Sequence, residues 1–417
     1  MIRVKNVMAS LRLSTLVWRM VLMSKQYSIF LEKAAEALDI PPSKYKQAVS
    51  RYEAVGTWLE SGEYNGQIEG VCIYPQGSFR LGTVIRPYKD HKDQDYDIDL
   101  VCELGAAVTS SDAEETKHLV GNRLKEHERY RQMLDKEGKR CWTLNYAEQD
   151  GVGFHMDVLP SVLSPTGVSQ TTISITSKID DGYEWCSSDP KGYAEWFKHR
   201  NRVAFERDAL RQKRSISLNF QDTYASIEDV PDLLVRTPLQ RAIQLLKRHR
   251  DVRFSDRANW KCAPISMIIT TIAVHLYQNE SDVLQALQNI ILSLDAHIPL
   301  LHGREVSANF SNQKIIHRLP DGTWYIGNPV NPDENFADRW HEDGNARAKA
   351  FFQWVEMLKE DFVSAAKSGD AVFKKKMEGL FDNAIANKYL PNSTPKVVPP
   401  PVRNVSISAA PKPWRNS

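Results

Sequence analysis

The sequence has little that would indicate a secreted, membrane-spanning or zinc-binding protein. Its five cysteines are scattered, with no CxxC pair and no His/Cys cluster, so neither a disulfide framework nor a zinc site is indicated. The most apolar stretch, residues 264–277, is shorter than a transmembrane helix requires. Basic and acidic residues nearly balance, 54 against 52, which gives no global signal for nucleic acid. We therefore expect a cytoplasmic protein that does not bind membranes and in which anion binding is local.

A P-loop is also missing, because GxxxxGK[ST] does not occur, and a P-loop NTPase is disfavoured. Instead the chain has Gln76-Gly77-Ser78, followed after a basic loop by the run DYDID at residues 95–99. Gly77 allows a tight turn, and Ser78 places a hydroxyl beside exposed N–H groups, which together form an anion-binding concavity. Alone, a Gly-Ser pair is usually a plain turn, and DYDID alone suits an acidic strand end or a calcium loop.

The acidic run alternates in the manner of a strand. Asp95, Asp97, Asp99 and Val101 fall on one face, and Tyr96, Ile98 and Leu100 fall on the other. Two carboxylates at this spacing can share divalent cations, and magnesium prefers one or two carboxylates together with substrate phosphates. The pattern predicts a two-metal site for phosphoryl transfer, with Mg²⁺ or Mn²⁺. Asp95 is an alternative first ligand.

These motifs resemble the DNA polymerase β-like nucleotidyltransferase superfamily, in which a Gly-Ser pair and a short helix precede Asp-x-Asp at the start of a strand. The resemblance implies a third acid on a neighbouring strand, for which Asp157 in FHMDVLP (154–160) is the candidate. It also favours Asp97 and Asp99 over Asp95, because the apolar strand starts directly after Asp99. His155 shares a face with Asp157, but a lone histidine there is more often a hydrogen-bonded neighbour, so we leave it outside the catalytic set.

The combination GSFRLGT, DYDIDL and MDVLPS is similar to the bacterial cGAS/DncV-like nucleotidyltransferases (CD-NTases), and MDVLPS also resembles the 2′-5′ oligoadenylate synthetases. This implies an α+β fold: a polymerase β-like lobe with a mixed sheet and helices, a helical second lobe, and an active-site cleft between them. A length of 417 residues also favours two lobes. We expect five segments: an extension or disordered arm preceding a start at Met23 (1–22), N-terminal helices including a spine helix (23–62), the nucleotidyltransferase core (63–235), the helical lobe (236–391) and a Pro-rich flexible tail (392–417).

Three helix expectations concern the site. Residues 111–140 are expected to form a solvated outer helix. Thr237-Pro238 should open a helix whose buried stripe leaves Lys247 at the polar margin, and the resemblance implies that this lysine contacts the triphosphate. It also implies that Ser266, at the start of the apolar helix 264–277, lies beside the nucleotide base. The basic clusters in residues 198–214 and 247–257 are interpreted as solvated helix faces, so nucleic acid is not expected as a partner.

The resemblance implies that the enzyme makes a cyclic di- or trinucleotide second messenger from NTPs in bacterial anti-phage (CBASS) signalling. Asp97 and Asp99 would bridge two Mg²⁺ ions, Asp157 would complete the site, and a second set would hold the nucleotide: Gln76, Gly77, Ser78, Lys247 and Ser266. An accessory regulatory or conjugating protein acting on the C-terminal tail is a further expected partner, although the chain ends in Asn416-Ser417. The alternatives are a nucleotidyltransferase that modifies an RNA end or a partner protein, and a non-catalytic nucleotide-binding module.

Overall fold

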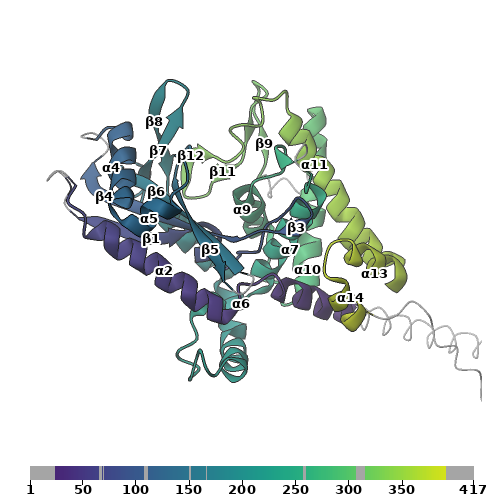
Figure 1. The fold of residues 1–417 in the computed structure, drawn as a ribbon. Helices are drawn as coiled ribbons and strands as arrows, with labels where there is room; N and C mark the ends of the chain where they lie inside the picture. Colours follow the sequence, from purple (N-terminus) through teal and green to yellow (C-terminus); the bar gives the residue numbers. More distant parts are fainter. Residues whose placement is uncertain are drawn as a thin grey trace, which may run out of the picture.

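The computed structural model describes most of the chain between residues 24 and 390. The described ranges are 24–64, 68, 70–107, 111–149, 152–165, 167–256, 260–306 and 315–390. The expectations for residues 1–22 and 392–417 lie outside them. Figure 1 shows a lobe built on a sheet at the left and a helical lobe at the right. The predicted α+β architecture is therefore confirmed.

The sheet lobe contains six strands in the order β1-β4-β6-β7-β8, with β5 paired to β6 off this path. Their bounds are β1 Val71–Gln76, β4 Tyr96–Ala107, β5 Trp142–Gln149, β6 Val152–Leu163, β7 Ile173–Ile179 and β8 Gly182–Ser188. β4 and β6 run parallel and the other pairs are antiparallel, so the sheet is mixed, as the sequence predicts. The long strand β6 pairs with β5 through its first half and with β7 through its last three residues.

The alternation in β4 and β6 sets the two faces of the sheet. Ile98, Leu100, Met156 and Val158 are fully buried in one core, which is covered by α2 (Pro42–Glu60) and α4 (Ala113–Glu126). The other face of the strands carries the acidic residues, as period-2 geometry requires. The hydrophobic core thus orients the carboxylates away from it.

The expectation of one helix over residues 111–140 is wrong. After α4 the backbone becomes extended at His127 (φ −83°, ψ 118°), and α5 (Glu128–Met133) then begins. The ring of His127 packs against Trp58 and Tyr130, contacts that favour the break over a continuous helix. Lys117 on α4 is fully buried rather than solvated, and its Nζ donates to the carbonyl of Gly138 at 3.1 Å.

The second lobe is a set of helices with two small hairpins. The helices are α6 Pro190–Asn219, α7 Pro238–Arg253, α9 Ser266–Leu276, α10 Val283–Asp295, α11 Ala346–Leu358, a π-helix Lys359–Ser364, α12 Ala365–Ser368, α13 Asp370–Glu378 and α14 Asn383–Tyr389. The hairpins are β9 His317–Arg318 with β10 Trp324–Tyr325, and β11 Gly327–Asn328 with β12 Asn331–Asn335. Helix α9 is buried along most of its length. Among the described residues, no helix has both the length and the apolarity needed to cross a bilayer.

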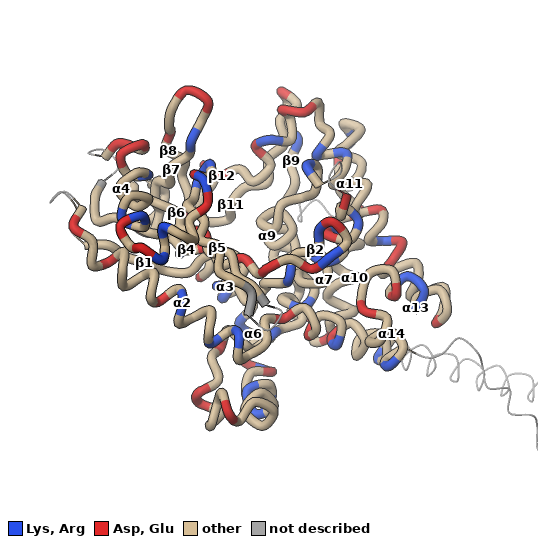
Figure 2. The backbone as a smooth tube through the Cα atoms, in the orientation of Figure 1, with Lys and Arg blue, Asp and Glu red and all other residues tan. Residues whose placement is uncertain are grey.

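Helix α6 carries the first basic cluster and extends below both lobes in Figure 1. Its charges are largely balanced locally, because Arg207 and Arg211 pair with Asp208, and Lys213 pairs with Asp232. Figure 2 shows basic and acidic residues interspersed over the two lobes. This distribution agrees with interpreting the cluster as a solvated helix face.

Helix α7 joins the lobes. Thr237 and Gln240 form a capping box at its start, and Gln240 also donates to the carbonyl of Leu81 at 2.8 Å. One turn later Gln244 donates to the carbonyl of Val84 at 3.0 Å. Polar side chains of α7 therefore satisfy the backbone of the loop that follows α3 (Gly77–Leu81), the short helix at the end of β1.

A buried ionic contact ties the N-terminal helices to the same junction. A helix over residues 24–36 packs in the core of the helical lobe, whereas α2 packs on the sheet. Between them, Asp39 accepts from Arg236 and Arg241 as well as from Gln244. The pKa of Asp39 is lowered by the two arginines although burial opposes this. Residues 24–62 thus bridge the two cores.

Candidate active site

The two strands β4 and β6 bring the three predicted carboxylates together. Their parallel register pairs Asp99 with Asp157 and Asp97 with His155. Neighbouring strands lie about 4.8 Å apart, so the Cα atoms of Asp99 and Asp157 are adjacent on the same face. Segments more than fifty residues apart in sequence therefore contribute to one acidic surface. The carboxylates point away from the apolar interior, because the intervening residues of each strand are buried.

Gly77 lies opposite Asp99 at the end of β1. Strand β1 runs antiparallel to β4, with Gln76 in register with Asp99. Gly77 follows with a φ of +59°, and a Cβ there would lie 2.5 Å from Oδ2 of Asp99. Both the left-handed backbone and the close approach require glycine. The Gly-Ser turn and the acidic strand are thus built against each other.

Mutual repulsion and burial raise the pKa values of two of these acids. The pKa of Asp99 rises to about 7, first through burial and then through the charges of Asp157 and Asp97. The pKa of Asp97 rises to about 6 through burial and the charges of Asp157, Asp95 and Asp251, although His155 opposes the shift. The Asp97 side chain is still 57% exposed, so it faces open space while neighbouring atoms reduce its hydration. The site concentrates negative charge that a cation would neutralise.

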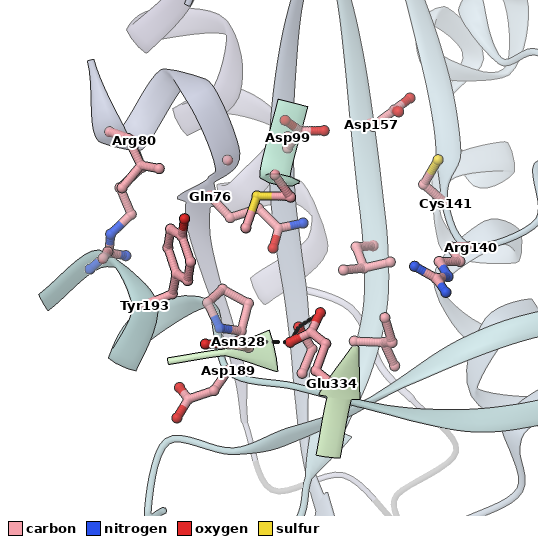
Figure 3. Close-up of a pocket in the computed structure, with 18 residues that line it drawn as sticks. Gln76, Arg80, Asp99, Arg140, Cys141, Asp157, Asp189, Tyr193, Asn328 and Glu334 are labelled. Carbon is pink, nitrogen blue, oxygen red and sulfur yellow. Dashed lines mark hydrogen bonds between the residues drawn. The ribbon is translucent and has the colours of Figure 1, made fainter. Parts of the chain in front are cut away.

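Asp157 is held from one side by strand β5. Its Oδ1 accepts from the hydroxyl of Thr143 at 2.5 Å. The thiol of Cys141 is close by, and burial together with the charge of Asp157 raises the pKa of Cys141 to about 12, so this cysteine is a neutral thiol. Figure 3 shows Asp99 and Asp157 on adjacent strands, with Cys141 beyond Asp157.

The donor chemistry fits magnesium or manganese. Within the described ranges, no group of three or more His, Cys, Asp or Glu side chains forms a complete metal site. Magnesium, however, is commonly held by one or two carboxylates plus substrate phosphates. Asp97 and Asp99, assisted by Asp157, are the residues that could hold such ions. Asp95 precedes β4, near His155, and lines neither of the cavities described next.

Two cavities open on this surface and share part of their walls. The larger, about 950 Å³, is lined by Ser78, Asp97, Lys247 and Ser266 among others. The smaller, about 280 Å³, is lined by Gln76, Gly77, Asp99 and Asp157 among others. The residues common to both are Arg140, Cys141, Ile175 and Glu334. All eight residues assigned from the sequence therefore line one cavity or the other.

Lys247 does not lie at a polar margin, contrary to expectation. It is only 3% exposed, because α7 is packed between the helical lobe and the loop after α3. Its Nζ donates to the carbonyl oxygen of Thr83 at 3.1 Å and lies 3.4 Å from the Thr83 hydroxyl. Burial and the nearby Arg250 lower the pKa of Lys247 to about 7. The lysine is thus on the wall of the larger cavity and tethered to the loop behind Ser78.

Several polar residues of the smaller cavity were not assigned to the site from the sequence, among them Arg140, Asp189 and Glu334. Arg140 falls in the segment 111–140 that was expected to be a helix. Glu334 lies on the short strand β12, in a stretch that the sequence alone indicates only as a loop. A single sequence carries no local signal that these side chains meet the acidic strand, because the contact is made by the tertiary fold.

The chain is similar to known proteins. Residues 72–160 match the family model described as cyclic GMP-AMP synthase DncV-like, nucleotidyltransferase domain. Over 359 residues the chain is 30% identical to a c-di-GMP synthase of Roseivirga ehrenbergii. The alignment covers 85% of this chain and 83% of that protein. Over 360 residues it is 24% identical to the cyclic dinucleotide synthase CdnG of Bradyrhizobium diazoefficiens, covering 84% and 78% respectively.

The fold has a solved counterpart. A structure of the Bradyrhizobium diazoefficiens CD-NTase CdnG in complex with GTP superimposes with a TM-score of 0.63 at 21% identity, covering 87% of this chain and 97% of that chain. At this identity the likeness concerns the fold. Taken with the extended similarity to the Roseivirga protein, it confirms the family resemblance, and the chain belongs to the CD-NTases as a nucleotidyltransferase.

Proposed function

We propose that this enzyme joins two NTPs into a cyclic dinucleotide, with GTP as a substrate and pyrophosphate as the leaving group. The observation that carries the proposal is the register of Asp99 with Asp157 opposite Gly77, in a cavity that shares part of its wall with a larger one. The relatives support the product class, since one is named a c-di-GMP synthase and another a cyclic dinucleotide synthase. Two cavities also suit a reaction that needs one donor and one acceptor nucleotide.

Each residue then has a defined task. Asp97 and Asp99, with Asp157, hold Mg²⁺ or Mn²⁺, which supplies Lewis-acid stabilisation of the attacking and leaving oxygens. Gly77 lets the backbone pass close to the triphosphate, and the Ser78 hydroxyl and Lys247 ammonium hold the phosphates in the larger cavity. The smaller cavity, where Asp99 and Asp157 face inward, receives the nucleotide whose ribose hydroxyl attacks.

A product assay tests this function. The purified chain is incubated with labelled NTPs and Mg²⁺ or Mn²⁺, then treated with phosphatase, and we expect a resistant cyclic dinucleotide from GTP. EDTA should abolish its formation. Label found only on added RNA or protein would favour a macromolecular acceptor instead, and tight NTP binding without turnover in any condition would favour a non-catalytic module.

Replacing Gly77 by alanine should reduce synthesis about 100-fold. The added Cβ would lie 2.5 Å from Asp99 Oδ2, and the backbone φ of +59° is unfavourable for alanine. Gly303→Ala is the matched control, because Gly303 has a φ of +70° with no atom within 4 Å of an added Cβ. Steady-state rates and thermal unfolding of both variants separate the clash from backbone strain. Equal losses of activity in the two variants would contradict the assigned role.

We also propose that the product acts as a second messenger in anti-phage defence, which is the role that the family resemblance implies. Phage should form fewer plaques on cells that express the wild-type chain within its native gene neighbourhood than on cells that express Asp99→Asn. Equal plaque counts would argue for a different physiological role, without affecting the enzymatic proposal.

A further inference from the structure

Strand β12 carries an acidic side chain from the helical lobe to the sheet. In Figure 1, β11 and β12 reach from the helical side toward β7 and β8. Asn331 on β12 donates to the Ser187 hydroxyl at 2.8 Å, and the Ser188 hydroxyl lies 3.3 Å from both carboxylate oxygens of Glu334. These contacts fix Glu334 on the wall that the two cavities share.

The carboxylate of Glu334 retains capacity to accept hydrogen bonds. Its Oε2 accepts from Asn328 Nδ2 at 2.8 Å, and its remaining partner is the shared Ser188 hydroxyl. Among the described residues, no Lys, Arg or His nitrogen lies within the 4.0 Å ion-pair distance of Glu334. Burial raises the pKa of Glu334, although its hydrogen bonds with Asn328 and Ser188 and the charge of Arg140 oppose the shift. A ligand with N–H donors would supply the missing partners.

The neighbouring acid in this cavity, Asp189, is already satisfied. Its Oδ1 accepts from the backbone N–H of Gly192 at 2.8 Å, which caps α6. Its Oδ2 accepts from the hydroxyls of Ser169 and Thr171 at 2.6 and 3.1 Å. Asp189 is therefore a structural group, and Glu334 is the acid that, besides the carboxylates Asp99 and Asp157, offers the smaller cavity capacity for a ligand. Figure 3 shows Glu334 across this cavity from Asp99.

We propose that Glu334 selects guanine in the acceptor nucleotide by accepting hydrogen bonds from N1–H and the 2-amino group. This inference rests on the proposed function and names the residue that sets its base choice. Guanine presents two adjacent donors, which match the two oxygens of a carboxylate. Adenine and cytosine each present one donor beside an acceptor, and uracil presents a single N–H between two carbonyls. Each of these bases would place an acceptor against a carboxylate oxygen or leave a polar group unpaired.

The geometry indicates that Glu334 contacts the base of the acceptor nucleotide rather than that of the donor nucleotide. Asp99 and Asp157 line the smaller cavity, whereas Ser78, Asp97 and Lys247 line the larger. The two groups that hold Glu334, Asn328 and Ser188, line the smaller cavity and not the larger. Apolar walls from Leu159, Ile175 and Met267 suit a flat base. A ribose at the carboxylates would direct its base toward Glu334.

The test separates the two substrate roles. α,β-Methylene analogues of GTP, ITP and ATP keep the ribose hydroxyls but cannot donate, and labelled 2′,3′-dideoxy-GTP can donate but cannot accept. We expect the wild type to form linear dinucleotide with acceptor KM rising from guanine to hypoxanthine to adenine, since hypoxanthine lacks only the 2-amino donor. Glu334→Gln should raise the KM for the guanine acceptor about 10- to 100-fold, with the KM for the dideoxy donor unchanged.

The substituted amide offers one acceptor and one donor, which matches adenine, so the variant should shift its preference toward the adenine acceptor. Glu334→Asp keeps both oxygens and should preserve the base order. Glu184→Gln, on the exposed side of β8, is the matched control and should behave as wild type. An unchanged guanine preference in Glu334→Gln, or equal use of guanine and hypoxanthine by the wild type, would overturn the inference.

The failure of the proposed function would look different. If the wild type forms no product from any acceptor, that function is rejected. Equilibrium binding of the α,β-methylene GTP and ATP analogues to wild type and Glu334→Gln then decides the role of Glu334 by itself. A loss of about 10-fold confined to the guanine analogue supports the inference, and equal affinities of the two proteins for both analogues refute it.

Discussion

Replacing Asp99 by asparagine should reduce dinucleotide synthesis about 1,000-fold or more while making the metal-free protein more stable. The loss follows because the amide has no negative charge to hold a cation opposite Gly77. The gain follows because burial and the charges of Asp157 and Asp97 disfavour the ionised Asp99 carboxylate. We expect the free energy of unfolding to rise by about 1–2 kcal/mol above pH 7 in EDTA.

The raised pKa of Asp99 determines how the stability of the metal-free protein changes with pH. The pKa of Asp99 is raised to about 7 in the folded state from 3.8, so between about pH 4 and pH 7 the folded state binds more protons than the unfolded state. The stability of the metal-free wild type should therefore fall as the pH rises through this window. Asp99→Asn should lack this part of the decline. Urea titrations at pH 5 and pH 8 measure it.

Two further variants make the result specific. Asp181→Asn removes an equal charge from the exposed turn between β7 and β8 and should change neither rate nor stability appreciably. Asp95→Asn tests the alternative ligand, which lines neither of the two cavities at the carboxylates, and should retain most activity. A defect in Asp95→Asn as severe as that in Asp99→Asn, or activity within 10-fold of wild type in Asp99→Asn, would contradict the assignment.

Replacing Asp361 by alanine should cost about 3–5 kcal/mol of unfolding free energy. Asp361 is only 1% exposed and lies on the π-helix after α11. It accepts from His249 Nε2 at 3.1 Å, contacts Lys376 Nζ at 3.0 Å, and pairs with Arg253. The variant would leave the fully buried His249 donor unsatisfied and the two cations without their shared partner.

The protonation state of this cluster follows from its bonds. Trp354 donates its Nε1–H to Nδ1 of His249 at 2.9 Å, so the neutral histidine carries its proton on Nε2 and donates it to Asp361. Burial lowers the pKa of His249. Bonds from His249, Lys376 and Arg253 hold the pKa of Asp361 well below its usual range despite burial.

A depressed carboxyl pKa contributes stability that is present above the unfolded pKa, about 3.9, and is lost as the pH falls toward the folded value. Chemical denaturation at pH 7 and pH 3 should therefore show a smaller difference between wild type and Asp361→Ala at the acidic pH. Glu360→Gln is the control, because Glu360 pairs with Lys376 on the surface and should cost less than about 1 kcal/mol. A loss for Asp361→Ala no larger than for this control would show that the cluster is dispensable.

The contact has a consequence for the site. His249 and Arg253 belong to the last turns of α7, the helix that also presents Lys247 to the larger cavity. Asp361 and Lys376 thus anchor that end of α7 to the π-helix and to α13. The stability of the helical lobe and the placement of Lys247 should therefore be coupled.

The acidic strand, its partner strand and the family could be predicted from the amino-acid sequence. Alternation in residues 95–101 and 154–160 is a local consequence of strand geometry, and the buried residues Ile98 and Met156 agree with it. The helix start at Thr237-Pro238 was equally readable, because capping depends on adjacent residues. The motif order was sufficient to predict the α+β fold that the structure confirms.

Features that depend on contacts between distant segments could not be predicted from the sequence. The helix break at His127 accompanies ring packing against Trp58, and Lys247 is buried because a loop some 160 residues earlier lies over α7. Glu334 reaches the cavity of Asp99 through contacts between β12 and β8. Local sequence patterns indicate which face of a helix or strand is apolar. Which other element covers that face depends on how the whole chain packs. This packing places Glu334 across the smaller cavity from the carboxylates.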